Sequence, residues 1–109
     1  QYSDSFSNYL KKHYLPLIIA LTELDLKHNY IEDEGVRHLS EALKHNTVLT
    51  QLDIYGNHIG HEGARYISEM LQLNTVLTEL FMSRNNIGAE GARHLSQALQ
   101  TNTVIFHRY

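Results

Sequence analysis

The sequence predicts an α/β fold in which strand–helix units stack along one axis as a parallel solenoid. Three consecutive segments of 28 residues, 21–48, 49–76 and 77–104, follow one another without a gap, and 13 of the 28 columns are identical in all three. Each segment opens with an alternating pattern, as in "LTELDL", and continues with apolar residues at helical spacing. Repeats of this length indicate stacked copies of one supersecondary unit, with strands on one side and helices on the other.

Each segment divides into a strand and a helix. The alternation of "LTELDL" has the period of a half-buried strand. From about Glu34 the apolar residues of the first copy fall on one helical face, at Val36, Leu39, Ala42 and Leu43. The leucines of both patterns are therefore expected between the strand layer and the helix layer.

The whole chain of 109 residues is expected to form one domain. Residues 1–20 are expected to be an N-terminal cap, with Asp4 as helix N-cap and Pro16 ending the helix. The three repeats follow, and residues 105–109 form a terminal strand or a truncated fourth repeat. In "VIFHRY" the polar Arg108 stands where the second leucine belongs, which would suit a polar edge strand.

The invariant polar columns are interpreted as scaffold. The asparagine after each strand is expected to bond to its own loop and to the next coil; these are Asn29, Asn57 and Asn85. A second asparagine, Asn46, Asn74 or Asn102, is expected to end each helix.

Two further invariant columns lie at the start of each helix. The glycines are expected where a helix packs closely on the sheet; these are Gly35, Gly63 and Gly91. Glutamates in the first helical turn would interact favourably with the positive end of the helix dipole; these are Glu34, Glu62 and Glu90.

Composition excludes several classes of function. The net charge of −3 is not that of a nucleic-acid binder, and the longest apolar run, 15–21, is too short to span a bilayer. The chain has no cysteine, which excludes disulfides and thiolate metal sites and fits a reducing compartment such as the cytoplasm. Neither a nucleic acid nor a membrane is therefore expected as a partner.

The eight histidines do not predict a metal site. His58 and His61 are three residues apart in a loop, whereas zincin histidines are four apart on a helix, and the adjacent Glu62 belongs to a repeat column. Ser40 and its repeat mates Ser68 and Ser96 are expected on the outer helical face, without a base or a pocket. No metal, cofactor or enzymatic activity is expected.

The repeat pattern resembles the ribonuclease-inhibitor-like class of leucine-rich repeats. The phrases "NTVLTEL" and "NNIGAEGARHLSQAL" are similar to repeats of NOD-like receptors and of leucine-rich-repeat effectors from intracellular bacteria. The resemblance covers 21–104 and implies a horseshoe segment with the sheet on its concave face. It also implies a protein-binding function, by analogy of fold.

The candidate partner-binding residues are those that vary between copies at strand columns expected to face solvent. They form an acidic margin around a central aromatic group of Tyr55 and Phe81, as protein-binding hot spots do. Phe81 replaces an aspartate column where a polar residue would suit folding better, although it could instead cover the sheet beside Tyr109. The full set is Glu23, Asp25, Lys27, His28, Gln51, Asp53, Tyr55, Glu79, Phe81, Arg84, His107 and Tyr109.

The sequence therefore predicts a monomeric module that recognises a protein through its concave sheet face. The partner could be an enzyme with a basic or mixed-charge surface, which the module would inhibit or regulate, and a bacterial effector would act in the host cytoplasm. One alternative is a sensor fragment of a larger NOD-like protein. Another alternative is a consensus design. Three idiosyncratic residues, His58, Leu73 and Phe81, argue against it.

Overall fold

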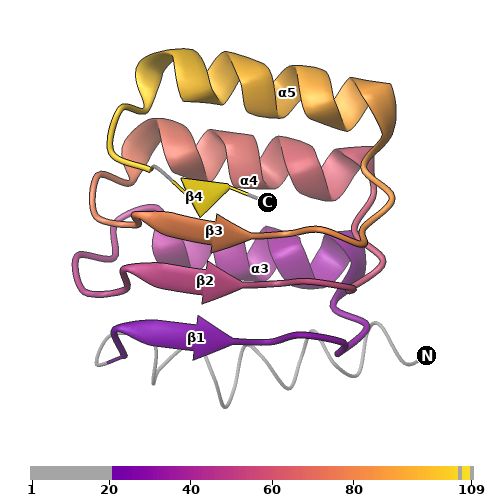
Figure 1. Ribbon diagram of the computed structural model, residues 1–109, viewed down its shortest axis with the longest axis horizontal. Helices are drawn as coiled ribbons and strands as arrows, with labels where there is room; N and C mark the ends of the chain where they lie inside the picture. Colours follow the sequence, from indigo (N-terminus) through magenta and orange to yellow (C-terminus); the bar gives the residue numbers. More distant parts are fainter. Residues whose placement is uncertain (1–20, 106, 109) are drawn as a thin grey trace.

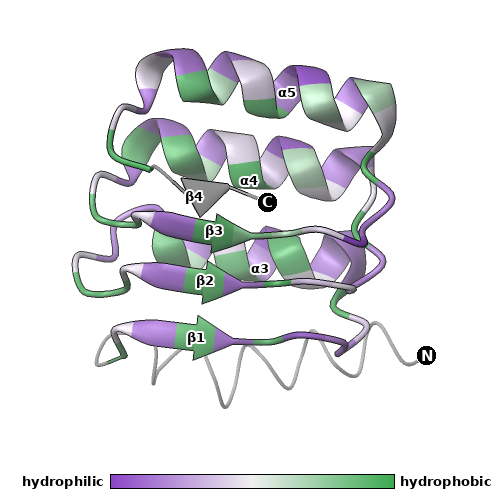
Figure 2. Ribbon diagram, viewed as in Figure 1, coloured by the Kyte–Doolittle hydropathy of each residue, from purple (hydrophilic) through white to green (hydrophobic). Residues whose placement is uncertain are grey.

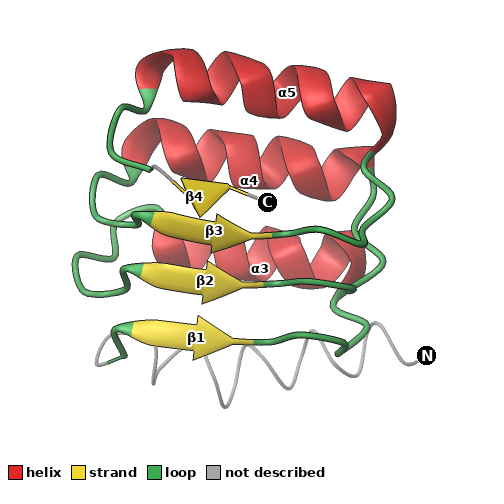
Figure 3. Cartoon of the chain, in the orientation of Figure 1, coloured by secondary structure: helices red, strands yellow, loops and turns green. Residues whose placement is uncertain are grey.

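The computed structural model describes residues 21–105 and 107–108, so the predicted cap at 1–20 and Tyr109 lie outside the described residues. The strands are β1 (Glu23–Asp25), β2 (Gln51–Asp53), β3 (Glu79–Phe81) and β4 (His107–Arg108). The helices are α3 (Glu32–Leu43), α4 (His61–Leu73) and α5 (Gly88–Thr101). Strands and helices alternate along the chain, as the repeats predict (Figure 3).

The four strands form one parallel sheet in the order β1-β2-β3-β4, and the helices make a second layer behind it (Figure 1). Neighbouring strands pair equivalent columns, so that Leu24 lies beside Leu52 and Leu52 beside Leu80. β4 continues this register, with Arg108 beside Leu80. The α/β arrangement is confirmed, while the horseshoe curvature stays a prediction.

The core is formed by apolar side chains of both the strands and the helices. Figure 2 shows hydrophobic positions along the ribbons of both layers. Leu52 and Ile54 of the second copy are fully buried, as are Ile67 and Met70 of α4. The helical face predicted from spacing is therefore the buried face. No helix in the described part of the chain is long and apolar enough to cross a membrane.

Asparagine side chains tie successive coils together where the strands end. The Asn57 side chain accepts hydrogen bonds from the backbone N–H groups of Asn29 and Ile31, at 2.8 and 3.2 Å, and donates to the carbonyl of Leu26 at 2.9 Å. Asn85 repeats the pattern one coil later, accepting from the N–H groups of Asn57 and Ile59. The expected bonds to the asparagine's own loop occur at the Tyr55 and Ser83 carbonyls, but the expectation of bonds to the next coil was wrong, because Asn57 and Asn85 serve the preceding coil.

The second asparagine column forms a similar ladder at the other end of the strands. The Asn74 side chain donates to the carbonyl of Leu43 at 2.8 Å and accepts from the N–H groups of Val76 and Leu77. Asn102 likewise donates to the carbonyl of Leu71 at 2.8 Å. These residues follow the helices, as predicted, but they also bond each helix end to the preceding one.

The invariant glycines permit close approach between helices. A Cβ atom at Gly63 would overlap Ile59 Cγ2 and lie 2.6 Å from Asp33 Oδ1 of the preceding helix. One at Gly91 would lie 3.0 Å from Ala64 Cβ in α4. The expected glycine contact with the sheet was wrong, since the neighbours are the previous helix and the isoleucine of the glycine's own loop.

The serine column also lies between helices rather than on their outer face. Ser40 and Ser68 are only 2% and 4% exposed, and Ser68 Oγ donates to the Ala64 carbonyl at 2.7 Å. Ser96 is exposed because no further described helix covers α5. A small side chain is needed wherever another helix packs on this column.

The asparagine ladder predicts a large effect of Asn57→Ala. Loss of the amide leaves buried backbone groups of two coils without partners, so the free energy of unfolding should fall by about 2–4 kcal/mol. Chemical denaturation followed by circular dichroism measures this change. Asn29→Ala is the matched control, because Asn29 is exposed and its side chain donates only to the Lys27 carbonyl; it should cost less than about 1 kcal/mol.

The glycine contact predicts that Gly63→Ala destabilises the protein by about 1–3 kcal/mol through overpacking against Ile59 and Asp33. Gly60→Ala is the matched control, because its nearest neighbour would be Asp33 Oδ2 at 3.3 Å and its φ of −99° suits alanine. Thermal melts of both variants should show the larger drop for Gly63→Ala. Equal drops would contradict the helix–helix explanation.

Candidate functional site

The side chains on the open face of the sheet come from the third and fifth columns of each repeat. The register places Glu23 beside Gln51 and Gln51 beside Glu79. The intervening leucines are buried, so these polar side chains lie on the face opposite the helices. We call the open surface formed by the candidate residues of the three repeats the strand face; its members are Glu23, Asp25, Lys27, His28, Gln51, Asp53, Tyr55, Glu79, Phe81 and Arg84.

A lysine partly neutralises the acidic side of the strand face. Lys27 Nζ lies 2.7 Å from Asp25 Oδ2 and 3.4 Å from Asp53 Oδ2. The side-chain hydrogen bond from Lys27, together with its backbone N–H bond, holds the pKa of the Asp25 carboxyl below its usual value. The same hydrogen bond raises the pKa of Lys27. Two acids of the predicted margin, Asp25 and Asp53, therefore share one ammonium, and we call them together with Lys27 the triad.

Aromatic rings lie beside this triad. Phe81 is the register neighbour of Asp53 and is half-buried. The Tyr55 ring meets the His28 ring edge-on, with centroids 5.1 Å apart. The structure therefore brings Tyr55, Phe81 and the charged triad onto adjacent strands and the loops that follow them.

The remaining candidates lie at the edges of this surface. Arg84 is exposed in the loop after β3, and His107 pairs in register with Glu79 through the backbone of β4. Tyr109 lies outside the described residues, so its predicted contact with Phe81 stays a prediction. Binding by any of the candidate residues also stays a prediction.

Two residues after β1, the exposed Tyr30 of the loop and the half-buried Glu32 of α3, were absent from the sequence-based candidates. Tyr30 is 60% exposed and stacks on His58 of the next coil, with ring centroids 4.6 Å apart and an interplanar angle of 8°. Glu32 follows it at the start of α3 and has a positive φ of 60°. The signal in the sequence was column variation, because the other copies have His58 and Asn86 in place of Tyr30 and Gly60 and Gly88 in place of Glu32.

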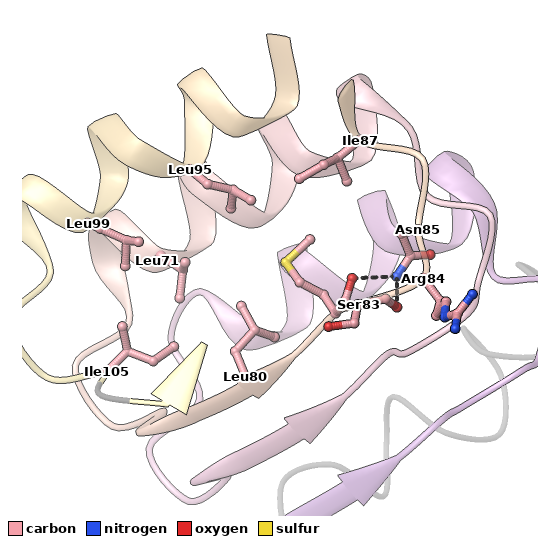
Figure 4. Close-up of a pocket in the computed structure, with 10 residues that line it drawn as sticks. Leu71, Leu80, Ser83, Arg84, Asn85, Ile87, Leu95, Leu99 and Ile105 are labelled. Atoms are coloured by element: carbon pink, nitrogen blue, oxygen red, sulfur yellow. Dashed lines mark hydrogen bonds between the residues drawn. The ribbon is translucent and has the colours of Figure 1, made fainter. Parts of the chain in front are cut away.

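An apolar groove of about 470 Å³ lies at the α5 end of the stack (Figure 4). Its lining includes Leu95 and Leu99 of α5, which are only partly buried, whereas their column mates Ile67 and Leu71 are covered by the next helix. Asn85 lies at one end, where its side chain donates to the carbonyls of Met82 and Ser83. The groove thus follows from α5 being the last described helix.

The described residues offer little to metal or nucleophilic chemistry. No group of three His, Asp or Glu side chains that could hold a metal ion occurs among them. Glu62 accepts a hydrogen bond from Arg65 Nε at 2.9 Å, and the equivalent Glu34 and Glu90 pair with Arg37 and Arg93. The glutamate column therefore forms ion pairs along the helix surface.

Comparisons with known proteins agree with this architecture. A family model described as "Leucine Rich repeat" matches residues 20–40, 45–68 and 73–96. A solved structure of "Leiomodin-1 Actin-Binding Site 2 (ABS2)" matches with a TM-score of 0.81 and 24% identity, covering 86% of this chain and 57% of that chain. The tropomodulin C-terminal domain of Caenorhabditis elegans matches with a TM-score of 0.74 and 18% identity, covering 99% and 63% of the respective chains.

At these identities the two likenesses show the fold alone. The chain spans less than two thirds of the length of each of these structures. A search of curated proteins finds no match to the chain.

The triad predicts how the pKa of Asp25 responds to Lys27→Met. Removing the ammonium removes the hydrogen bond that lowers this pKa, so the pKa of Asp25 should rise toward its usual value. A carboxyl carbon NMR titration of both proteins measures it, with Lys44→Met as the control because Lys44 pairs with Glu41 on a helix.

The lowered pKa of Asp25 also fixes the sign of its effect on stability. The carboxyl contributes stability above its unfolded pKa, and this contribution is lost as the pH falls through the lower folded value. Both partners are exposed, so the stability change should be small and screened by salt. An unchanged pKa of Asp25 in Lys27→Met would contradict the assigned cause.

Proposed function

We propose that this chain, which belongs to the leucine-rich repeat family, is a protein-recognition module that binds its partner through the strand face. Parallel strands in register present one variable side chain per repeat at each exposed column. Buried leucines and asparagine ladders hold the backbone in place, so these columns can vary without loss of fold. Such a surface suits recognition of another protein.

The observation that carries the proposal is Phe81. It occupies the column held by Asp25 and Asp53, directly beside Asp53 in the sheet, and it is only half-buried. A bulky aromatic residue ringed by charge is typical of interface anchors. Tyr55, held edge-on by His28, supplies a second ring close to the same carboxylates.

The charges of the strand face suggest the chemistry of the partner. Asp25 and Asp53 share only Lys27, and Glu23 adds a further carboxylate, so a basic or mixed-charge surface complements this region. We therefore propose a protein partner, bound by a monomeric chain without cofactor. More specifically, we propose that the partner is an enzyme whose active site the chain covers, as in a ribonuclease-inhibitor-like role.

The cellular setting is also a proposal. The absence of cysteine suits a reducing compartment, and we place the chain in the cytoplasm, or in the host cytoplasm if it is a bacterial effector. A regulatory sensor fragment of a larger NOD-like protein is the alternative setting for the same surface. Actin is the first defined protein to test, because the similar leiomodin structure is that of an actin-binding site.

Replacing Asp53, Tyr55 and Phe81 together by alanine should abolish partner binding, because the change removes both aromatic anchors and the carboxylate between them. Binding is measured by sedimentation with actin and by quantitative affinity capture from cells of the source. Circular dichroism should show an unchanged fold, since all three side chains lie on the open face.

The matched control replaces Glu41, Gln72 and Leu73 by alanine; these three exposed residues lie on the helix layer. This variant should capture the same protein as the parent chain. If the strand-face variant still binds, or if the helix-layer variant does not, the binding site lies outside the strand face.

A further inference from the structure

The loops that follow β1 and β2 carry four rings arranged in two pairs. Tyr30 stacks on His58, and His28 meets Tyr55 edge-on. We call this set (His28, Tyr30, Tyr55 and His58) the ring rim. These loops lie where the chain leaves the sheet for the helices (Figure 1). Tyr55 also belongs to the strand face.

The rings pack closely against their neighbours. A Cβ atom at Gly56 would lie 2.6 Å from His28 Nδ1, so the His28 ring occupies the space above this glycine. The Tyr30 and His58 rings are parallel to within 8°, and Tyr30 is still 60% exposed. The ring rim therefore presents an ordered aromatic surface to solvent.

The backbone beneath the ring rim is unfavourable for these residue types. Tyr30, Glu32 and His58 have φ values of 52°, 60° and 57°, in the left-handed region that costs an L side chain stability. Glycine takes the columns of Glu32 and His28 in other copies, although Gly60, also in the column of Glu32, has φ of −99°. Gly88 has φ of 68° in the column of Glu32, and Gly56 has φ of 65° in the column of His28.

Glu32, two residues after Tyr30 and half-buried at the start of α3, adds a carboxylate beside the ring rim in the sequence. Most carboxylates in the described residues are engaged, as with Glu34 and Arg37 or Asp33 and the Gly60 N–H. No hydrogen bond or ion pair of the Glu32 side chain occurs among the described residues. The helix dipole already has Asp33 and Glu34 in the same turn, so it does not require a third acid.

We propose that the ring rim, together with Glu32, binds an arginine side chain of a protein partner. A guanidinium can stack on the exposed face of Tyr30 and pair with a carboxylate, whereas the compact lysine ammonium cannot stack as a plane. The three acids of the first turn of α3 oppose the positive end of the helix dipole, which would otherwise disfavour a cation there. This proposal rests on the proposed function in one respect, namely that the partner supplying the arginine is a protein.

The test uses the full chain and a defined probe. A short capped peptide with one central arginine is titrated against the isotope-labelled protein and followed by amide NMR. Matched peptides with lysine and with the neutral, planar citrulline separate charge from stacking. The arginine peptide should shift the amides of residues 28–32 and 56–58 with a dissociation constant on the order of 10 mM, as one stacked ion pair implies.

Two substitutions borrowed from the chain's own repeats test the residues. Tyr30→Asn takes the residue of the third copy, and Glu32→Gly takes that of the second and third copies. Each should weaken the arginine peptide at least about fivefold. Neither should lower the melting temperature, because Glu32→Gly relieves backbone strain and asparagine tolerates the left-handed region. Glu34→Gln, which removes a carboxylate already paired with Arg37, should leave peptide binding unchanged.

Three results would overturn the proposal. The first is the absence of saturable shifts at the ring rim, and the second is equal binding of the lysine or citrulline peptide. The third is a lower melting temperature in Glu32→Gly with peptide binding retained, which would assign Glu32 to the scaffold. None of these results depends on the strand-face variant, so the two proposals can fail separately.

Discussion

The structure depends on hydrogen bonds from asparagine side chains to the backbone of the preceding coil. At both ends of the short strands some backbone N–H and C=O groups, such as those of Ile31 and Leu26, are buried, where unpaired groups would be costly. Asn57 satisfies groups of Asn29, Ile31 and Leu26, and Asn85 does the same for the following coil. A repeat of 28 residues is kept because any insertion would move an amide away from its partners.

This ladder separates the residues that hold the fold from those that are free to vary. Leucines, asparagines, the interhelical glycines and the buried serines all contact a neighbouring coil, so their columns are constant. Folding does not require particular side chains on the strand face, and one of its columns changes from acid to aromatic between copies. At the ring rim the residues are even unfavourable for the backbone, since the positive φ of Tyr30 and Glu32 would suit glycine or asparagine better.

The sequence predicted the order of elements, the parallel register and the buried helical face, because period and repeat length determine these directly. It did not predict which copy a side chain contacts. Ser68 was expected on the outer helical face and Gly63 against the sheet, but their positions are decided by packing against the next or previous helix. The sign of φ at Tyr30 and Glu32 is also not encoded in hydrophobic spacing, so the ring rim became visible only in the structure.

The central claim is that a protein partner lies against Phe81. The direct measurement places a photo-reactive benzoyl-phenylalanine at position 81 and, in a second protein, at position 73, which is exposed on the helix layer. Irradiation in a lysate of the source cells, followed by mass spectrometry, identifies what each position touches. A specific protein should be crosslinked from position 81 and not from position 73. Crosslinking of the same protein from position 73 alone would contradict the central claim.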